Sequence, residues 1–129
     1  MPQTSPVVPC LSIDGAKAAI DFYKKAFAAD EISRADAGDG KRLIHAHLRI
    51  NGGDLYMWDF FPEYGGKAEA PAGVIIHLEV DDAEGWWKRA VDAGATVTMP
   101  IEDTFWGMRY GQLRDPFGHG WSIGAPLNK

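Results

Sequence analysis

The chain has 129 residues, of which 46% are hydrophobic and 24% charged, and this balance is typical of one globular domain with a continuous core. The formal net charge of -5 and the lack of any basic run argue against a nucleic-acid partner, because phosphate binding requires clustered lysines and arginines. A single cysteine, Cys10, cannot form an intrachain disulfide, and no segment approaches the ~20 apolar residues of a membrane span. We therefore expect a cytoplasmic protein that binds neither nucleic acid nor membrane.

The first predicted elements recur later in the chain, which indicates an internal repeat. Residues 7–30 and residues 74–97 both read as a short strand, an acidic turn and an amphipathic helix with apolar residues along one face. Asp14 and Asp82 are the expected N-terminal caps of the two helices, and Gly94 is expected to end the second helix.

Strand-like segments follow each helix and are separated by turn residues. The expected strands are residues 31–37, 43–50 and 55–60 in the first half, and residues 96–99, 108–114 and 121–124 in the second. The prediction is an α+β fold of two tandem βαβββ modules, residues 1–61 and 74–129, whose curved mixed sheets enclose a cavity. A linker at residues 62–73 joins the modules within a single domain, because each half alone would leave one face of its sheet bare.

Alternation along the strands separates the two faces of each sheet. In residues 43–50 the apolar face is expected to carry Ile44, Ala46, Leu48 and Ile50, and the opposite face to be polar. Polar, aromatic and titratable side chains gather on that second face in both halves, which is typical of a ligand cavity. A solvated sheet face is the alternative. The candidate ligand-binding residues are His45, His47, Arg49, Tyr56, Trp58, His77, Glu79, Tyr110, Gln112 and Arg114, with Trp106 added from a loop.

Five short motifs occur in a fixed order along the chain. They are Ala-Ile-Asp-Phe-Tyr at 19–23, His-Ala at 45–46, Ala-Gly-Ala at 93–95, Phe-Trp-Gly at 105–107 and Asp-Pro-Phe-Gly-His at 115–119. With these motifs the sequence resembles the vicinal-oxygen-chelate superfamily of glyoxalases, bleomycin-resistance proteins and dioxygenases, and within it the PhnB-like branch. The resemblance covers nearly the whole chain, and it implies the glyoxalase fold and a homodimer.

Metal enzymes of that superfamily carry ligands at four positions, and the resemblance places these positions on residues that fit a metal poorly. They are Val8, Ile75, Ser122 and either Tyr56 or Trp58. None offers the imidazole or carboxylate that a divalent ion prefers, so we expect neither a metal nor another cofactor. The alternative is a relocated site built from His45, His47, His77 and Glu79.

The leading functional hypothesis is metal-independent sequestration of an aromatic or charged small molecule. Glu79 favours a cationic ligand, whereas Arg49 and Arg114 favour an anionic one, so the sign of the ligand stays open. The alternative is an enzyme, a lyase, isomerase or transferase with His47 or His77 as general base, with or without the relocated metal. A third hypothesis is a dimerising accessory module without a ligand.

Overall fold

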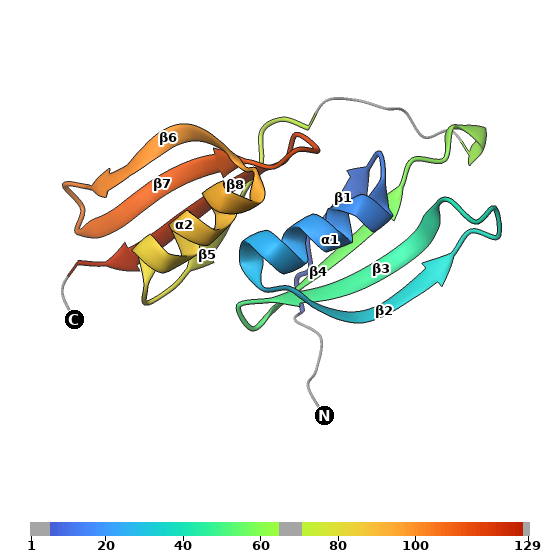
Figure 1. Ribbon diagram of the computed structural model, residues 1–129, viewed down its shortest axis with the longest axis horizontal. Coiled ribbons are helices and arrows are strands. Elements are labelled where there is room, and N and C mark those ends of the chain that lie inside the picture. Colours follow the sequence, from blue (N-terminus) through green and yellow to red (C-terminus); the bar gives the residue numbers. More distant parts are fainter. Residues whose placement is uncertain (1–5, 65–70, 128–129) are drawn as a thin grey trace. The chain divides into compact units, whose positions relative to one another are not determined.

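The computed structural model describes residues 6–64 and 71–127, which divide into two compact units, Met1–Glu69 and Ala70–Lys129. Each unit consists of one four-stranded mixed sheet and one α-helix (Figure 1). The α+β class and the repeated βαβββ order predicted from the sequence are therefore confirmed.

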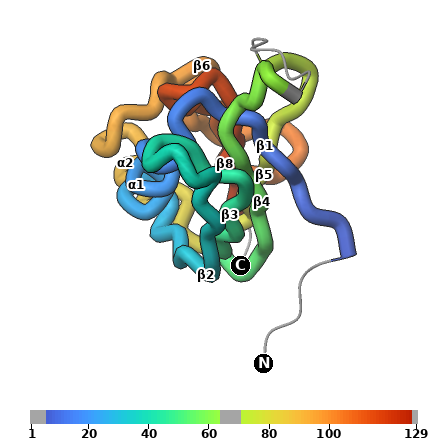
Figure 2. Tube along the Cα trace, turned by 90° about the vertical axis from the view of Figure 1, so that its right-hand side faces the viewer, coloured from blue at the N-terminus to red at the C-terminus, as the bar shows by residue number. Residues whose placement is uncertain are grey.

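In the first unit the chain runs through β1 (Cys10–Ile13), α1 (Ala16–Phe27), β2 (Asp30–Asp36), β3 (Leu43–Ile50) and β4 (Gly53–Asp59), and ends with the short 3-10 turn η1 (Pro62–Tyr64). The strands lie in the order β1-β4-β3-β2. β1 lies parallel to β4 at the edge of the sheet, and the other pairs are antiparallel (Figure 2).

The second unit repeats this topology with β5 (Ile75–Glu79), α2 (Ala83–Ala93), β6 (Thr96–Asp103), β7 (Met108–Arg114) and β8 (Gly120–Pro126). Its strands lie in the order β5-β8-β7-β6, with β5 parallel to β8. In each unit the helix joins the two edge strands, β1 to β2 and β5 to β6, and it crosses one face of the sheet between them.

Each helix buries its apolar stripe on one sheet face. α1 packs on β3 and β4, and its Tyr23 and Phe27 are fully buried. α2 packs on β8 and β6, where Gly111 of the neighbouring β7 leaves room for Trp87: a Cβ atom at Gly111 would lie 2.6 Å from the Trp87 ring. The helix-covered faces form the cores, and the opposite face of each sheet is left open by its helix.

The N-terminus of α1 is capped from a distant strand, and the prediction that Asp14 caps it is wrong. Gly15 adopts a left-handed backbone (φ 101°), and the amides of Gly15 and Ala16 each donate to Asp59 Oδ1 at 2.9 Å. The other oxygen of Asp59, which is 4% exposed, accepts from the amide of Leu43 at 2.8 Å. A carboxylate buried in the sheet therefore satisfies the helix amides that a local cap would otherwise bind.

The second helix follows the expectation from the sequence. Asp82 accepts from the amide of Gly85 at 3.1 Å, and Gly94 ends α2 with a left-handed backbone (φ 117°). Both caps were predicted and are confirmed.

The alternation expected along β3 fails at its start. Ile44, predicted to face the core, is 54% exposed, whereas Leu43 is fully buried. The register with β2 shifts here, because Ala35 pairs with His45 but Asp36 pairs with Leu43, which leaves Ile44 at a bulge. From Ala46 onward the predicted alternation holds.

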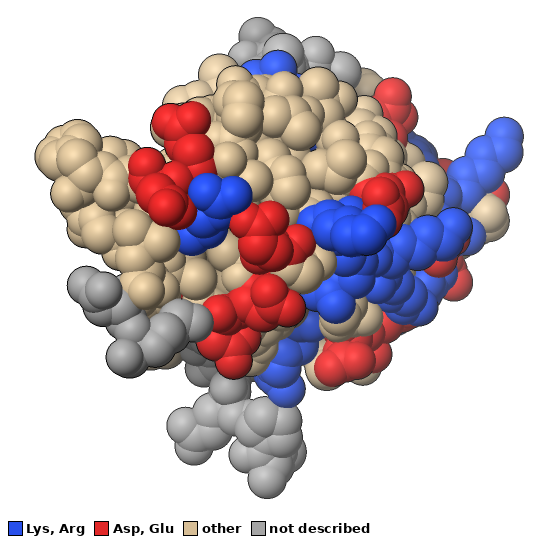
Figure 3. Space-filling model, turned by 60° about the vertical axis from the view of Figure 1, so that its left-hand side comes forward, with Lys and Arg blue, Asp and Glu red and all other residues tan. Residues whose placement is uncertain are grey.

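Charged side chains of both signs are mixed on the surface. On the face shown in Figure 3, Lys and Arg side chains are bordered by Asp and Glu. Elsewhere Arg34 and Lys24 hydrogen-bond Glu31 and lower its pKa to about 2. No helix within residues 6–64 and 71–127 is long and apolar enough to cross a membrane.

Candidate ligand-binding site

In the first unit a buried carboxylate organises the face that α1 leaves open. Asp54 Oδ1 lies 2.7 Å from His47 Nε2, and it accepts from Arg49 Nη2 at 2.7 Å and from Arg49 Nε at 3.1 Å. The side chain of Asp54 is 2% exposed, against 12% for His47 and 19% for Arg49. An ionised Asp54 only accepts hydrogen bonds, so Nε2 of His47 carries a proton and Nδ1 is the acceptor when the ring is neutral.

Aromatic rings continue this face across β3, β4 and β1. Tyr56 is paired with His47 and meets the rings of His45 and His47 edge-on, with centroids 4.7 Å and 5.0 Å away. Trp58 Nε1 donates to Ser12 on β1 at 3.1 Å. The His45 side chain makes no hydrogen bond to another described residue, so its ring nitrogens remain available to a ligand.

In the second unit the central strand of the sheet forms a floor of small residues. On the helix-free face β8 presents Gly120, Ser122 and Gly124, which pair with β5 on one side and β7 on the other. A Cβ atom at Gly124 would lie 2.9 Å from His77 Cε1 and 3.3 Å from Tyr110 Cδ1. We call this strip of the helix-free face, between β5 and β7 and over these three residues of β8, the trough; His77 and Tyr110 lie over its Gly124 end.

His77 is held over this trough by hydrogen bonds to both ring nitrogens. Its Nδ1 lies 2.7 Å from Ser122 Oγ, and its Nε2 lies 2.8 Å from Glu79 Oε1. Because ionised Glu79 only accepts, Nε2 carries the proton, and the Ser122 hydroxyl donates to Nδ1 when the ring is neutral. Ser122 is 1% exposed and therefore acts as a support for His77.

A row of rings leads from His77 to the loop between β6 and β7. Tyr110 stacks on His77 with centroids 5.9 Å apart, and Trp106 meets Tyr110 at 5.9 Å. Gln112 donates to the Tyr110 hydroxyl at 3.1 Å, which fixes the far end of that ring. Trp106 is 55% exposed, so one end of the row is open to solvent.

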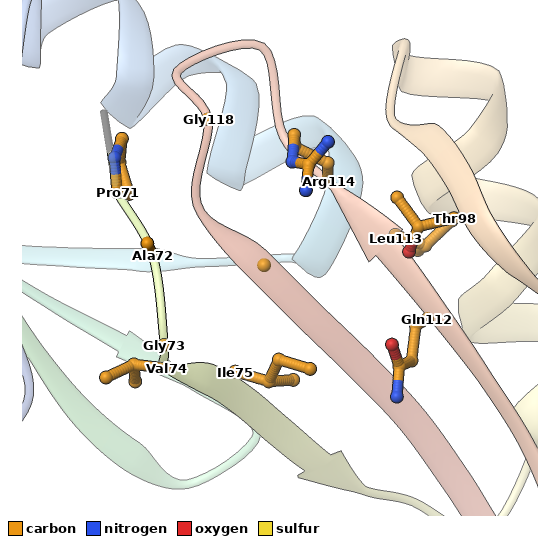
Figure 4. Close-up of a pocket in the computed structure, with 11 residues that line it drawn as sticks. Pro71, Ala72, Gly73, Val74, Ile75, Thr98, Gln112, Leu113, Arg114 and Gly118 are labelled. Carbon is orange, nitrogen blue, oxygen red and sulfur yellow. The ribbon is translucent and has the colours of Figure 1, made fainter.

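The other end of the trough opens into a cavity of about 390 Å³ (Figure 4). Gln112 and Arg114 of β7 stand on one side, Val74 and Ile75 stand on the other, and β8 runs between them. Its volume falls within the range of small-molecule sites, ~300–1,000 Å³. The described residues that line it are Pro71, Ala72, Gly73, Val74, Ile75, Thr98, Gln112, Leu113, Arg114, Gly118 and Gly120.

The predicted site residues thus form two sets. The first unit brings together His45, His47, Arg49, Tyr56 and Trp58. The second unit brings together His77, Glu79, Trp106, Tyr110, Gln112 and Arg114.

Two polar groups of these faces were missed as site residues. Asp54 has the same parity as Tyr56 and Trp58, and continuing the alternation back to the hairpin turn would have found it. Ser122 was considered only as a metal position, although its pairing with His77 places their side chains in contact.

The positions that would hold the superfamily's metal do not fit one. Val8 and Ile75 carry no donor atoms, and Ser122 is hydrogen-bonded to His77. Within residues 6–64 and 71–127 no group of three or more His, Cys, Asp or Glu side chains is arranged to hold a metal ion.

The chain therefore has a duplicated βαβββ fold, in which the helix of each unit leaves one polar face of its sheet open. The chain belongs to the Glyoxalase/Bleomycin resistance protein/Dioxygenase superfamily, which it matches over residues 7–123. It is 49% identical over 127 residues to an uncharacterized protein of Mycobacterium bovis, covering 94% of this chain and 83% of that protein.

Solved structures show the same fold. A protein from Pseudomonas aeruginosa matches with a TM-score of 0.79 and 27% identity, covering 95% of this chain and 98% of that chain. A PhnB protein from Bacillus cereus matches with a TM-score of 0.72 and 20% identity, covering 94% of this chain and 99% of that chain. The second likeness concerns the fold alone, and the PhnB-like branch remains a prediction.

Proposed function

We propose that the chain binds a small organic molecule on these open faces without using a metal. The trough of the second unit carries this proposal. Its floor is made of two glycines and a serine, one end is aromatic, and the other opens into the cavity of about 390 Å³. Gly124 has no room for a side chain, because His77, Met108 and Tyr110 already lie over it. Gly120 lines the cavity instead, and because a glycine weakens a strand, close approach of a ligand is a reason for a glycine at this position.

A planar ligand suits the aromatic end. The rings of Tyr110 and Trp106 offer stacking surfaces, and His77 adds a third ring whose orientation is fixed by Ser122 and Glu79. Such aromatic contacts contribute ~0.5–1.5 kcal/mol each beyond the area that they bury.

The experiment is a fragment titration followed through backbone amide signals by NMR. A set of planar fragments, neutral and charged, should shift the amides of β5, β7 and β8 and leave those of α2 unchanged. Gly120→Val places a branched side chain in the trough, and we expect it to abolish these shifts while a melting curve shows that the fold is kept. If no fragment perturbs the trough, or if Gly120→Val binds as the parent does, the binding function is wrong.

An enzymatic function is the second candidate, and the two histidine–carboxylate pairs favour it. His47 beside Asp54 and His77 beside Glu79 each have the arrangement of an oriented general base. A fragment that binds is kept with the protein in D₂O and followed by proton NMR. Exchange of a carbon-bound proton that is lost in His47→Gln or His77→Gln supports catalysis, whereas an unchanged fragment supports binding alone.

The homodimer is a further proposal, based on the superfamily to which the chain belongs. Light scattering on the purified chain tests it, with twice the monomer mass of 14.1 kDa as the expected result and the monomer mass as the contrary one.

A further inference from the structure

The charge of the ligand, which the sequence leaves open, is indicated by the lining of the cavity. Arg114 is the one charged residue among the eleven described residues that line it. The other lining groups are apolar side chains, glycines, Thr98 and Gln112. The cavity therefore carries a local positive charge, although the whole chain has a formal net charge of -5.

The guanidinium of Arg114 has no carboxylate partner within residues 6–64 and 71–127, since no hydrogen bond or ion pair joins it to another described side chain. The neighbouring acid is committed elsewhere: the buried Asp115 accepts from the amides of Phe117 and His119 and from the indole of Trp121. By contrast, Arg49 shares an oxygen of Asp54 and Arg109 is bound by Glu84 and Asp103. Arg114 is thus in a position to bind an anion brought by a ligand.

An apolar wall faces this arginine across the trough. Val74 is 73% exposed and Ile75 is 47% exposed, and both line the cavity opposite Arg114 (Figure 4). A ligand with an apolar body would remove that surface from water, at ~25 cal/mol per Å². Glu79 lies four residues beyond Ile75 along β5, ~13 Å away at ~3.3 Å per residue, and it is hydrogen-bonded to His77. The acidic group therefore belongs to the far end of the trough.

Resting on the proposed binding function, we infer that the ligand is an organic anion, a carboxylate or phosphate ester with an apolar body, whose acidic group is bound by Arg114. Guanidinium groups bind both kinds of anion through paired hydrogen bonds, and each such bond is about twice as strong as a neutral one. The Gln112 side chain, next along the same face of β7, lies where it can contact the ligand beyond the anion.

The test uses three probes of similar size and different charge: 3-phenylpropionate, 3-phenylpropanamide and 3-phenylpropylamine. Calorimetry and amide NMR should show the carboxylate binding at the trough at least tenfold more tightly than the amide, and the amine binding more weakly still. A tenfold ratio corresponds to 1.4 kcal/mol. A fourth probe, 2-phenylethyl phosphate, distinguishes the two anion classes, and either anion binding preferentially supports the inference.

Variants of two arginines on the same strand provide the control. Arg114→Gln should reduce the affinity for 3-phenylpropionate about tenfold, to the level of the amide, and leave the affinity for the amide unchanged, while Arg114→Lys should restore part of the loss. Arg109→Gln removes the same charge from β7 at a residue that binds Glu84 of α2, and it should leave both affinities unchanged.

The outcomes separate this inference from the binding function. If the amide or the amine binds as tightly as the better of the two anions, if Arg114→Gln binds that anion as the parent does, or if only the neutral fragments bind, the anionic ligand is wrong and the binding function stands. If none of the probes binds, and the neutral fragments above also leave the trough unperturbed, both are wrong.

Discussion

Replacing Asp59 by alanine should destabilise the chain more than any change at an exposed acid. The substitution leaves three backbone amides without their acceptor, those of Gly15, Ala16 and Leu43, at a side chain that is 4% exposed. A hydrogen bond to a charged acceptor contributes ~1.5–3 kcal/mol, and three bonds to one carboxylate are not additive. We expect a loss of about 3–5 kcal/mol, which moves a urea midpoint by roughly 2 M at a slope of ~2 kcal/mol/M.

The assay is urea unfolding followed by circular dichroism at the helix band, and its control is Asp14→Ala. Asp14 precedes the same helix and is exposed, but among the described residues it makes no hydrogen bond or ion pair, so its removal should cost less than ~0.5 kcal/mol. Asp59→Asn keeps the oxygen toward the helix and turns an amide donor toward Leu43, and its stability should lie between the two. An Asp14→Ala variant as unstable as Asp59→Ala would refute the distant cap.

Three further outcomes are expected. Gly124→Ala should weaken fragment binding at the trough and cost about 1–3 kcal/mol of stability, because its Cβ atom would lie 2.9 Å from Cε1 of the His77 ring, which Ser122 and Glu79 hold in place. Unchanged ring signals of His77 in NMR would contradict this. Gly111→Ala should cost about 1–3 kcal/mol, measured as a lower urea midpoint, because its Cβ atom meets the Trp87 ring at 2.6 Å and the backbone of Ile101 at 2.9 Å. Because the pKa of Glu31 is lowered from 4.5 to about 2, its ionised form stabilises the fold fully above pH 4.5, and this stabilisation is lost as the pH falls toward about 2. Glu31→Gln should therefore make the free energy of unfolding depend less on pH in this acidic range. An unchanged dependence would argue against the ion pairs of Glu31.

The sequence predicted the structure correctly where one hydrophobic period runs along a whole strand or helix. Alternation placed His47 and Arg49 on one face and Ala46 and Leu48 on the other, and the structure has the same arrangement. The repeat of strand, turn and helix was visible in the sequence because in both copies one amphipathic helix covers one face of a sheet. Local patterns of this kind do not depend on residues elsewhere in the chain.

Features that depend on distant residues were not visible. The N-terminus of α1 is capped by Asp59, which lies on β4, much later in the chain. The residues around Asp14 give no sign that Asp59, and not Asp14, caps this helix. The bulge at Ile44 is a property of two strands together, so the apolar character of Ile44 predicted the wrong face. The sign of the ligand was open for the same reason: Arg49 and Arg114 look alike in the sequence, and only their neighbours distinguish them.

At Gly120 of β8, a larger residue is expected to have opposite effects on the stability of the strand and on the proposed ligand binding. A β-branched residue at Gly120 would favour the extended backbone, and its Cβ atom would lie 3.3 Å from Ile75 Cγ1 and 3.5 Å from the carbonyl oxygen of Val74. Selection for thermal resistance alone should therefore tolerate or enrich bulkier residues there, whereas selection for ligand capture should remove them. On the proposed binding function, homologous chains that no longer bind a ligand are expected to carry larger residues on this strand.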